Sequence, residues 1–317
     1  VIISKVYKYR KEVFMLTICD NLKDAKFVTH DSKFHADDVF STIFLEKVFK
    51  DITLYRAKEI NASLYPDKII YDIGFGEFDH HQADSKVREN KVKYCSFGKL
   101  FEKYGKDYLK SLNVKDIDYA YDLFLHDFVM QIDAYDNGMF LSNPNDYKVS
   151  SLSEVVEYLN PTWCEEKSYN EAFYEAYQIF KVIFDRIEKR TLDYLKAKDM
   201  VEEKIEKSGN HLLLLNEYLP YSKAVLDSKS KKAEDIWFAI FPSNRGGYVI
   251  HTIPKEKNSF ELRCPLKEEW GGKEQEELEK LTGVLGFRFC HKNLFIASCD
   301  TLDGAIKIAN LAMNQKR

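Results

Sequence analysis

The stretch Lys68-Ile-Ile-Tyr-Asp-Ile-Gly-Phe-Gly-Glu-Phe-Asp-His-His-Gln82 joins an apolar run to a run of acids and histidines. The apolar run predicts a short β-strand that ends on Asp72, and Asp79, His80 and His81 follow in the next loop. Acids and histidines at the carboxyl ends of strands are the side chains from which metal sites in open α/β sheets are built. The stretch therefore predicts an α/β fold with divalent-metal, hydrolytic chemistry at the edge of its sheet.

A similar pattern occurs earlier in the chain. Lys26-Phe-Val-Thr-His30 predicts a strand, and the loop after it contains His35, Asp37 and Asp38. Either aspartate can cap a following helix, whose apolar residues recur at helical spacing. Strands separated by a helix predict βαβ units and a largely parallel sheet. The strands expected in this sheet are residues 26–30, 52–56 and 68–72.

Helical patterns follow the histidine doublet. Residues 97–104 and 116–133 place apolar side chains at helical spacing, and residues 152–205 are strongly helical and charged. We expect the segment 152–205 to be a packing arm that joins two domains rather than a catalytic element.

Beyond Lys207-Ser-Gly-Asn210 the pattern becomes β-rich, with a closing helix at residues 301–313. A chain of 317 residues also exceeds the usual size of a single hydrophobic core. The predicted fold class is therefore α/β. A largely parallel-sheet N-terminal domain with its helical connecting arm occupies residues 1–206, and a smaller α+β C-terminal domain occupies residues 207–317.

The composition is that of an ordinary globular protein, with 47 basic and 51 acidic residues and a net charge of −4. No global basic field indicates nucleic-acid binding, although a local groove could be basic. Six cysteines without a C-x-x-C pair disfavour a zinc ribbon and favour a reducing, cytoplasmic compartment. No apolar stretch approaches the ~20 residues of a membrane span. Translation is expected to start at Met15, because residues 1–14 make a poor signal peptide.

Two divalent ions that hydrolyse a phosphoester need roughly five or six protein ligands, with one carboxylate bridging. Asp72, at a predicted strand tip, is well placed to bridge. Imidazole and carboxylate ligands together suit Mn²⁺, with Mg²⁺, Co²⁺, Zn²⁺ or Fe²⁺ as alternatives. The candidate metal ligands are His30, His35, Asp37, Asp72, His80 and Asp133.

Each of these residues also has a simpler interpretation. A single His30 or His35 is more often a loop or capping histidine than a ligand, and Asp37 or Asp38 can serve as a helix N-cap. Asp136-Asn-Gly is a strong turn signal, so Asp136 is explained equally well by a turn and by a site. The metal site is favoured by the joint occurrence of the histidine doublet, the strand-end aspartate and an H-x-x-x-x-H-x-D loop in one βαβ unit.

These motifs resemble those of one branch of the DHH phosphoesterase superfamily. That branch is the melanocyte-proliferating-gene family of metal-dependent hydrolases, whose eukaryotic members act as 3′→5′ RNA exonucleases. The resemblance begins near residue 26, covers nearly the whole chain after it, and includes segments around Arg263, Trp270 and His291 in the second half. The motifs that carry it in the first half are Thr29-His-Asp-Ser-Lys-Phe-His-Ala-Asp-Asp38, Asp72-Ile-Gly74, Phe78-Asp-His-His-Gln82 and Val129-Met-Gln-Ile-Asp-Ala-Tyr-Asp-Asn-Gly138.

The resemblance implies a DHH-type catalytic domain followed by a substrate-binding domain. The six candidate ligands match the metal ligands of the superfamily. His81 matches the second histidine of the doublet, which would contact the scissile phosphate or protonate the leaving oxygen. Asp79 would orient one of the two histidines. Arg263 and His291 are the matching candidates for stabilising charge on the phosphoryl group, although a surface strand residue and a hairpin residue explain them equally well.

Two departures from the superfamily pattern leave metal occupancy and substrate binding open. The first motif is longer than the common H-x-x-x-D-x-D, and His35 stands in its middle position. The glycine-rich G-G-H substrate loop is absent, because Gly271-Gly272 is followed by Lys273.

The sequence therefore predicts a metal-dependent phosphodiester hydrolase, most simply a 3′→5′ exonuclease acting on RNA or short oligonucleotides with two Mn²⁺ ions. One alternative is a small-molecule phosphoesterase acting on pyrophosphate, a nucleotide or a cyclic dinucleotide. The acidic net charge favours this alternative over a nuclease for long polymers. Another is a non-catalytic metal or nucleotide sensor that keeps the fold. A homo-oligomer is compatible with any of these.

Overall fold

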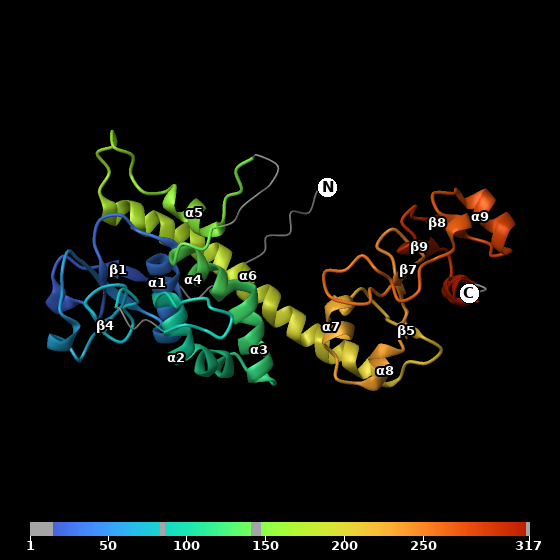
Figure 1. The fold of residues 1–317 in the computed structure, drawn as a ribbon, viewed down its shortest axis with the longest axis horizontal. Coiled ribbons are helices and arrows are strands. Elements are labelled where there is room, and N and C mark those ends of the chain that lie inside the picture. The colour runs from blue at the N-terminus through green and yellow to red at the C-terminus, as the bar shows by residue number, and fades with distance from the viewer. Residues whose placement is uncertain (1–14, 83–85, 141–146, 315–317) are drawn as a thin grey trace, which may run out of the picture. The chain divides into compact units, whose positions relative to one another are not determined.

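The structure is a computed structural model that describes residues 15–82, 86–140 and 147–314. The chain divides into two compact units, residues 1–192 and residues 193–317 (Figure 1). The division falls within the long helix α6 (Tyr169–Glu206), and a domain boundary at residues 206 and 207 stays a prediction. The expected translation start concerns residues 1–14, which lie outside the described residues.

The first unit contains a four-stranded sheet in the order β1-β3-β2-β4, in which every pairing is parallel. The parallel sheet confirms the prediction from the βαβ pattern. The three strands expected at residues 26–30, 52–56 and 68–72 form, although the last is only two residues long. The strands are β1 (Leu16–Ile18), β2 (Phe27–His30), β3 (Ile52–Ala57) and β4 (Ile69–Ile70).

Helix α1 (Ala36–Phe49) is the central element of the first unit, because residues 36–46 are buried on all sides. A phenylalanine-rich core surrounds it. The Phe40 ring, for example, meets the rings of Phe128 and Phe180 edge to face, at centroid distances of 5.0 and 5.8 Å. Such pairs add to the stability gained by burying each ring.

The helices that cover α1 contribute side chains to one hydrophobic core with it. Residues 116–133, predicted as one helix, form two α-helices joined by a π-turn, and the second helix continues to Asp136. The covering helices are α2 (Ser96–Ser111), α3 (Ile117–Phe124), the π-helical turn η3 (Leu125–Val129), α4 (Met130–Asp136), α5 (Leu152–Glu157) and α6.

The second unit contains a five-stranded mixed sheet in the order β5-β6-β7-β9-β8, in which only the β5–β6 pairing is parallel. Alternate residues of β6 enter two different hydrophobic clusters, so both faces of the sheet are covered. Among the described residues, no helix is both long and apolar enough to cross a membrane. The strands are β5 (Leu212–Leu214), β6 (Phe238–Pro242), β7 (Tyr248–Thr252), β8 (Phe287–Cys290) and β9 (Ile296–Cys299).

The remaining α-helices have eight residues or fewer, except α10, which is the closing helix predicted at residues 301–313. The helices and turns are α7 (Tyr221–Asp227), α8 (Lys231–Glu234), α9 (Gln275–Thr282), α10 (Leu302–Met313), and the 3₁₀ turns η1 (Leu22–Asp24), η2 (Ala62–Leu64) and η4 (Glu268–Trp270).

Candidate metal centre

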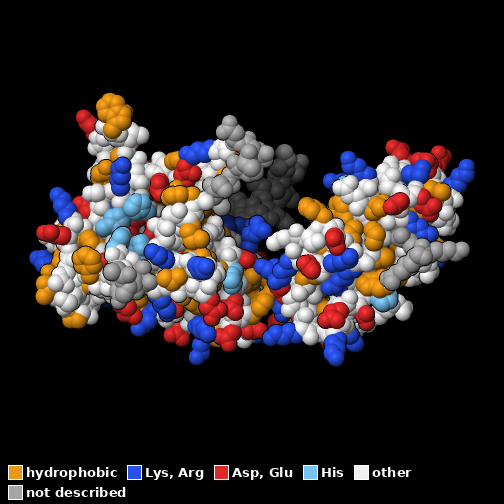
Figure 2. Space-filling model, in the orientation of Figure 1, with side chains coloured by type: hydrophobic (Ala, Val, Ile, Leu, Met, Phe, Trp, Pro, Cys, Tyr) orange, Lys and Arg blue, Asp and Glu red, His pale blue; other side chains and the backbone are white. Residues whose placement is uncertain are grey.

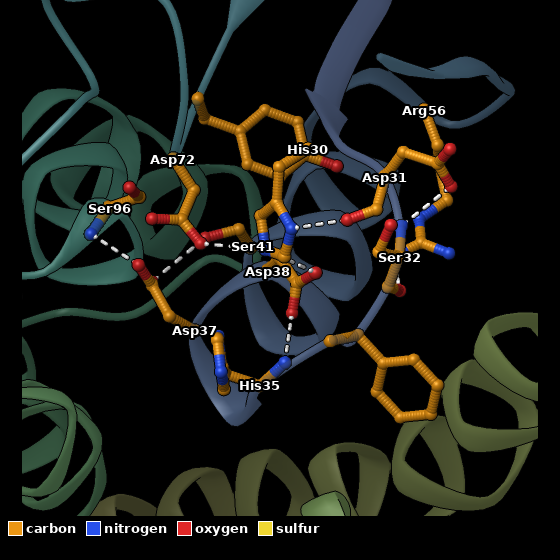
Figure 3. Close-up of polar contacts among 12 residues, drawn as sticks. His30, Asp31, Ser32, His35, Asp37, Asp38, Ser41, Arg56, Asp72 and Ser96 are labelled. Carbon is orange, nitrogen blue, oxygen red and sulfur yellow. Dashed lines mark hydrogen bonds and ion pairs between the residues drawn. The ribbon is translucent and has the colours of Figure 1, made fainter. Parts of the chain in front are cut away.

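His30 is the last residue of β2, and its ring is held in one orientation. Its Nδ1–H donates to the carbonyl oxygen of Asp31 at 2.9 Å. Its Nε2 lies 3.1 Å from Asp38 Oδ2 and 3.3 Å from Asp72 Oδ2 (Figure 3). His30 Nε2 and Asp38 Oδ2 are both buried and contact each other. A histidine fixed through Nδ1–H that presents Nε2 to two carboxylates has the arrangement of a metal ligand.

The loop between β2 and α1 brings His35, Asp37 and Asp38 to the same place. Asp38 Oδ1 accepts the His35 backbone N–H at 2.9 Å, so Asp38 does cap α1 while its other oxygen faces His30. Asp37 is fully buried and accepts the backbone N–H groups of Ser96 and Phe97 at 2.8 and 2.5 Å. These two amides belong to the first turn of α2, so a helix N-terminus fixes this carboxylate.

Asp72 follows β4 with a left-handed backbone φ of +57°. This conformation costs an ordinary residue about 1–2 kcal/mol, and such strain is typical of functional sites. The Asp72 N–H donates to the carbonyl oxygen of Phe78 at 3.2 Å, which closes the loop that carries the histidine doublet. Its two oxygens face different histidines, because Oδ1 lies 3.1 Å from His80 Nε2 while Oδ2 faces His30. This is the placement expected of a bridging carboxylate.

His80, the first histidine of the doublet, contacts aspartates of the two helices α1 and α4. Its Nε2 lies 3.1 Å from Asp136 Oδ2 and 3.7 Å from Asp37 Oδ2, in addition to its contact with Asp72. Asp136 is the last residue of α4, and the turn predicted at Asp136-Asn-Gly also forms there. The turn and the site are therefore compatible at this residue.

Asp133 is the predicted ligand that the structure does not bring into this group. Its Oδ2 forms a buried ion pair with Arg88 Nη1 at 2.6 Å, and its Oδ1 accepts the Cys95 N–H at 2.8 Å. The Arg88 guanidinium also lies 3.6 Å from the centroid of the Tyr94 ring. Asp133 therefore holds the beginning of α2 in place, and Asp136, one helical turn later, faces His80.

His81 and Asp79 form a separate pair beside the aspartate group. Asp79 Oδ1 accepts both the backbone N–H and the ring Nδ1–H of His81, at 3.0 and 2.8 Å. The His81 side chain is 58% exposed, whereas that of His80 is only 9% exposed. The doublet is thus divided into a buried histidine among the aspartates and an accessible histidine oriented by Asp79.

The histidines carry strongly raised pKa values in the absence of a cation. Burial opposes the charged form of His30, but the carboxylates of Asp38 and Asp72 outweigh burial and raise the pKa of His30 to about 11. Burial likewise opposes the charged form of His80, and Asp72 with its neighbouring aspartates raises the pKa of His80 to about 9. Protons therefore occupy these nitrogens in the metal-free protein.

The pKa values of the aspartates in this group are shifted as well. Burial and the nearby charge of Asp72 raise the pKa of Asp37 to about 7. Burial, Asp37 and Asp72 raise the pKa of Asp136 to about 8. Burial opposes the ionised form of Asp72 as well, but hydrogen bonds from His30 and His80 hold its pKa below the usual range. Four aspartates, Asp37, Asp38, Asp72 and Asp136, surround His30 and His80, so carboxylates outnumber these histidines and the group fits a divalent cation whose binding would release protons.

Among the described residues there are three groups of potential ligands, and within each group the ligand atoms lie within 4.8 Å of one another. Asp72 belongs to two of them, as a bridging residue would. Cys95 belongs to the third, but burial and the nearby charges of Asp133 and Asp37 raise the pKa of its thiol well above the usual value, so it is a weak ligand. The groups are His30, His35 and Asp72; Asp72, His80 and His81; and Asp37, Cys95 and Asp136.

A cavity of about 930 Å³ in the first unit is lined by most of these side chains, namely His30, His35, Asp72, His80, His81 and Asp136. Figure 2 shows histidine side chains gathered at the surface of this unit, with hydrophobic side chains and lysines or arginines nearby. The cavity walls also contain Lys58, Lys93, Phe75 and Phe140, which the sequence patterns did not single out. A cavity of this size can hold a nucleotide.

Arg263 and His291, the remaining predicted site residues, lie in the second unit. Arg263 Nη1 donates to the carbonyl oxygens of Ala233 and Ile236 at 2.5 and 2.8 Å, so the arginine fixes the chain around the end of α8. His291 Nδ1 accepts the Asn293 N–H at 3.0 Å in the β8–β9 turn, and its ring contacts that of Phe295. These contacts are structural, and a role of either residue at a phosphoryl group stays a prediction.

Comparison with known proteins connects the whole chain to one family. The family model MYG1_exonuc, described as an uncharacterised protein family (UPF0160), matches residues 26–313. A Dictyostelium discoideum protein named MYG1 protein is 28% identical, covering 93% of this chain and 98% of its own. A Rattus norvegicus protein named MYG1 exonuclease is 29% identical, covering 91% and 84% of the two chains.

Among solved structures, the pGpG-specific phosphodiesterase PggH from Vibrio cholerae aligns with 92% of this chain and 97% of its own. The alignment has 11% sequence identity and a TM-score of 0.29. A similarity at this level supports no argument about fold or function.

Proposed function

The chain belongs to the MYG1_exonuc family, and from this membership we propose that it is a metal-dependent phosphodiester hydrolase. The specific activity that we propose is 3′→5′ exonucleolytic cleavage of RNA or short oligonucleotides. Residues 1–206 would form a DHH-type catalytic domain, and residues 207–317 would bind substrate. The observation that carries the proposal is the convergence of buried aspartates and histidines: His30 Nε2 lies 3.1 Å from Asp38 and 3.3 Å from Asp72, and His80 Nε2 lies 3.1 Å from both Asp72 and Asp136.

The residues that we propose to hold two divalent ions are those whose ligand atoms converge. When bound, Mn²⁺ or another divalent ion would activate a water molecule and stabilise charge on the phosphoryl oxygens. Asp136 replaces Asp133 in the ligand set, because Asp136 faces His80 while Asp133 is paired with Arg88. The proposed ligands are His30, His35, Asp37, Asp38, Asp72, His80 and Asp136.

We assign proton transfer to His81. The Asp79 carboxylate accepts its Nδ1–H, which fixes the ring and leaves Nε2 as the proton-transferring atom. This hydrogen bond also raises the pKa of His81, although burial opposes it, so the imidazolium persists to higher pH. A protonated histidine in the cavity is suited to protonate the leaving oxygen of a cleaved phosphodiester.

A small-molecule phosphoesterase is the second candidate function. The net charge of −4 favours it, because tracking along a long polymer usually requires a basic groove. The same ligands and the same histidine would serve a pyrophosphate, a nucleotide or a cyclic dinucleotide. The two candidates differ in which substrates are turned over.

Turnover of end-labelled RNA by the purified protein with Mn²⁺ tests the proposal. We expect Asp72→Asn and His80→Ala to abolish cleavage, and Asp118→Asn, whose side chain is 81% exposed, to leave it intact. Labelling either the 5′ or the 3′ end reports the direction of cleavage. His81→Gln should lower kcat by roughly 10²–10⁴-fold while Mn²⁺ binding is retained, and a better leaving group should recover part of the loss.

A substrate panel from pyrophosphate to oligoribonucleotides separates the candidate functions. Turnover of small phosphoesters alone would favour the second candidate. Cleavage that is unchanged in both Asp72→Asn and His80→Ala would refute the assigned site. If no phosphoester is turned over but Mn²⁺ binds, the protein is a sensor rather than an enzyme.

A further inference from the structure

We propose that Phe75 is a base-stacking residue and that the lysine-lined cavity beyond it binds a second nucleotide of the substrate. The inference rests on the proposed phosphodiester hydrolysis and narrows its substrate to chains of at least two nucleotides. It concerns a part of the first unit that lies outside the group of metal-binding residues.

Two cavities of the first unit share a wall. The cavity with the metal-binding residues has a volume of about 930 Å³, and its neighbour has a volume of about 610 Å³. Phe75 and Gln82 line both of them. Each volume lies in the range of pockets that hold a small ligand. A substrate that places its scissile phosphate among the aspartates can therefore continue past Phe75 into the second cavity.

The Phe75 ring is presented to solvent at an energetic cost. Its side chain is 76% exposed, although exposure of a large aromatic ring is unfavourable. Its backbone has a left-handed φ of +57°, which is uncommon for a bulky residue. Strain and exposure at the same residue, at the wall of a proposed active site, are the pattern expected of a residue kept for ligand contact.

Asp79 connects the position of Phe75 to that of the proposed proton donor. Its Oδ2 accepts the Phe75 N–H at 2.7 Å, while its Oδ1 accepts the two N–H groups of His81. One carboxylate therefore fixes the backbone of Phe75 on one side and the ring of His81 on the other. A base stacked on Phe75 would be held at a constant offset from the phosphate that His81 serves.

The second cavity has the charge that a further phosphate requires. Three lysines line it, Lys86, Lys99 and Lys103, against the two glutamates Glu77 and Glu102. Lys86 and Lys103 each contact one glutamate, at 2.6 and 3.1 Å, so one positive charge is in excess.

Lys99 is the lysine that is best placed to supply this excess charge. Its ammonium donates to the backbone carbonyl oxygen of Asp79 at 2.5 Å, and an ammonium has three donors. It can therefore also serve a phosphate oxygen next to the residue that orients Phe75 and His81. A stacking ring followed by cations is how proteins bind single-stranded nucleic acid without reading its sequence.

The test compares Phe75→Leu and Phe75→Trp in the full-length Mn²⁺-loaded protein. All three side chains carry a Cβ on the same strained backbone, so only the π-face changes. We expect Phe75→Leu to lower kcat/KM for a short oligoribonucleotide about tenfold, as loss of one stacked base predicts, and Phe75→Trp to retain it. An oligonucleotide of equal length that lacks the bases should show no such dependence on residue 75. Trp163→Leu is the matched control, because Trp163 is 97% exposed and lines neither cavity.

The second subsite has its own readout. Lys99→Met should raise KM for a dinucleotide more than for a mononucleotide ester, since only the dinucleotide reaches the second cavity. Equal losses on base-containing and base-free oligonucleotides in Phe75→Leu, or a similar loss in Trp163→Leu, would overturn the stacking role. If no phosphoester is cleaved, the proposed function fails. The affinity of the Phe75 variants for a fluorescently labelled dinucleotide then still tests whether a base stacks on residue 75. Equal affinities of Phe75→Leu and the parent protein would refute the stacking role.

Discussion

Asp136→Asn is expected to stabilise the metal-free protein while it damages the metal site. In the native fold, burial, Asp37 and Asp72 raise the pKa of Asp136 from 3.8 to about 8. At pH 7 the raised pKa lowers the free energy of unfolding by at most about 4 kcal/mol. Roughly 3.2 pH units separate the ordinary pKa from pH 7, and each unit corresponds to about 1.36 kcal/mol. Asparagine also alters the contact that Asp136 Oδ2 makes with His80 Nε2 at 3.1 Å, so the expected net gain is smaller, about 1–2 kcal/mol.

The sign of this effect depends on pH in a defined way. A carboxyl group whose folded pKa is raised destabilises the fold once pH exceeds the unfolded pKa, and the penalty grows until pH reaches the folded pKa. The advantage of Asp136→Asn should therefore be absent near pH 4 and should increase toward pH 8. A variant that merely improved packing would show no such pH dependence.

Asp133→Asn is the same substitution three residues earlier, and we expect it to destabilise the protein instead. Asp133 Oδ2 lies 2.6 Å from Arg88 Nη1, and the two side chains are 0% and 8% exposed. Removing one partner of a buried ion pair costs about 3–5 kcal/mol, because the remaining charge is left buried. Asparagine can still accept the Cys95 N–H, so we expect a loss near the lower limit, about 3 kcal/mol.

The assay is urea unfolding of chelator-treated protein at several pH values, together with calorimetric titration of Mn²⁺. We expect Asp136→Asn to be more stable and to bind Mn²⁺ more weakly. Asp133→Asn should be less stable, and while folded it should retain Mn²⁺ binding. The exposed Asp118→Asn serves as the control for both measurements. Loss of Mn²⁺ binding in Asp133→Asn alone, with unchanged stability of that variant, would show that Asp133 is the ligand. It would refute the assignment of Asp136 in its place.

Three further predictions concern stability. Gly98→Ala would place a Cβ 2.3 Å from the carboxylate oxygen of a buried aspartate and should cost about 1–3 kcal/mol by thermal unfolding, whereas Gly209→Ala, with open space around it, should be nearly neutral. Burial lowers the pKa of His251 below 6.5 in the folded protein, so the neutral imidazole favours the fold fully above pH 6.5. This stabilisation is lost as the pH falls from 6.5 toward the pKa of the folded state. His251→Gln should therefore reduce the dependence of the free energy of unfolding on pH in this range, as measured by urea unfolding. Glu46 is buried and accepts hydrogen bonds from Tyr177 and Lys181, so Glu46→Gln should cost about 1.5–3 kcal/mol.

The regular part of the fold was predictable because long segments repeat their pattern several times. The segments that became α1 and α6 show apolar residues at helical spacing, and both helices form. The prediction of one helical region over residues 152–205 was wrong in part, because residues 158–168, between α5 and α6, are not helical. Helices α7, α8 and α9 were not predicted. They contain seven, four and eight residues, and segments this short span too few helical turns to establish a 3.6-residue period.

The candidate site was predictable where the backbone alone determines side-chain position. His30 ends β2 and Asp72 follows the parallel strand β4 after one intervening residue, and parallel strands bring their carboxyl ends to one edge of the sheet. Phe75 and the lysines of the cavities could not be identified in this way. Their placement depends on loop conformation and on helix packing, and an exposed phenylalanine has no pattern that separates it from a core residue.

Asp133 and Asp136 lie three residues apart in α4 and make different contacts. Periodicity treats residues 116–133 as one α-helix, in which each residue advances the side-chain direction by about 100°. The π-turn at Leu125–Val129 interrupts this regular advance, so the apolar spacing upstream does not determine the direction of side chains beyond it. Asp133 is directed to Arg88 and the start of α2, and Asp136 to His80. A π-turn leaves no signature in hydrophobic spacing, but π-turns occur frequently at functional sites. An aspartate three residues beyond a predicted ligand on the same helix should therefore be considered as an alternative ligand whenever the helix carries function.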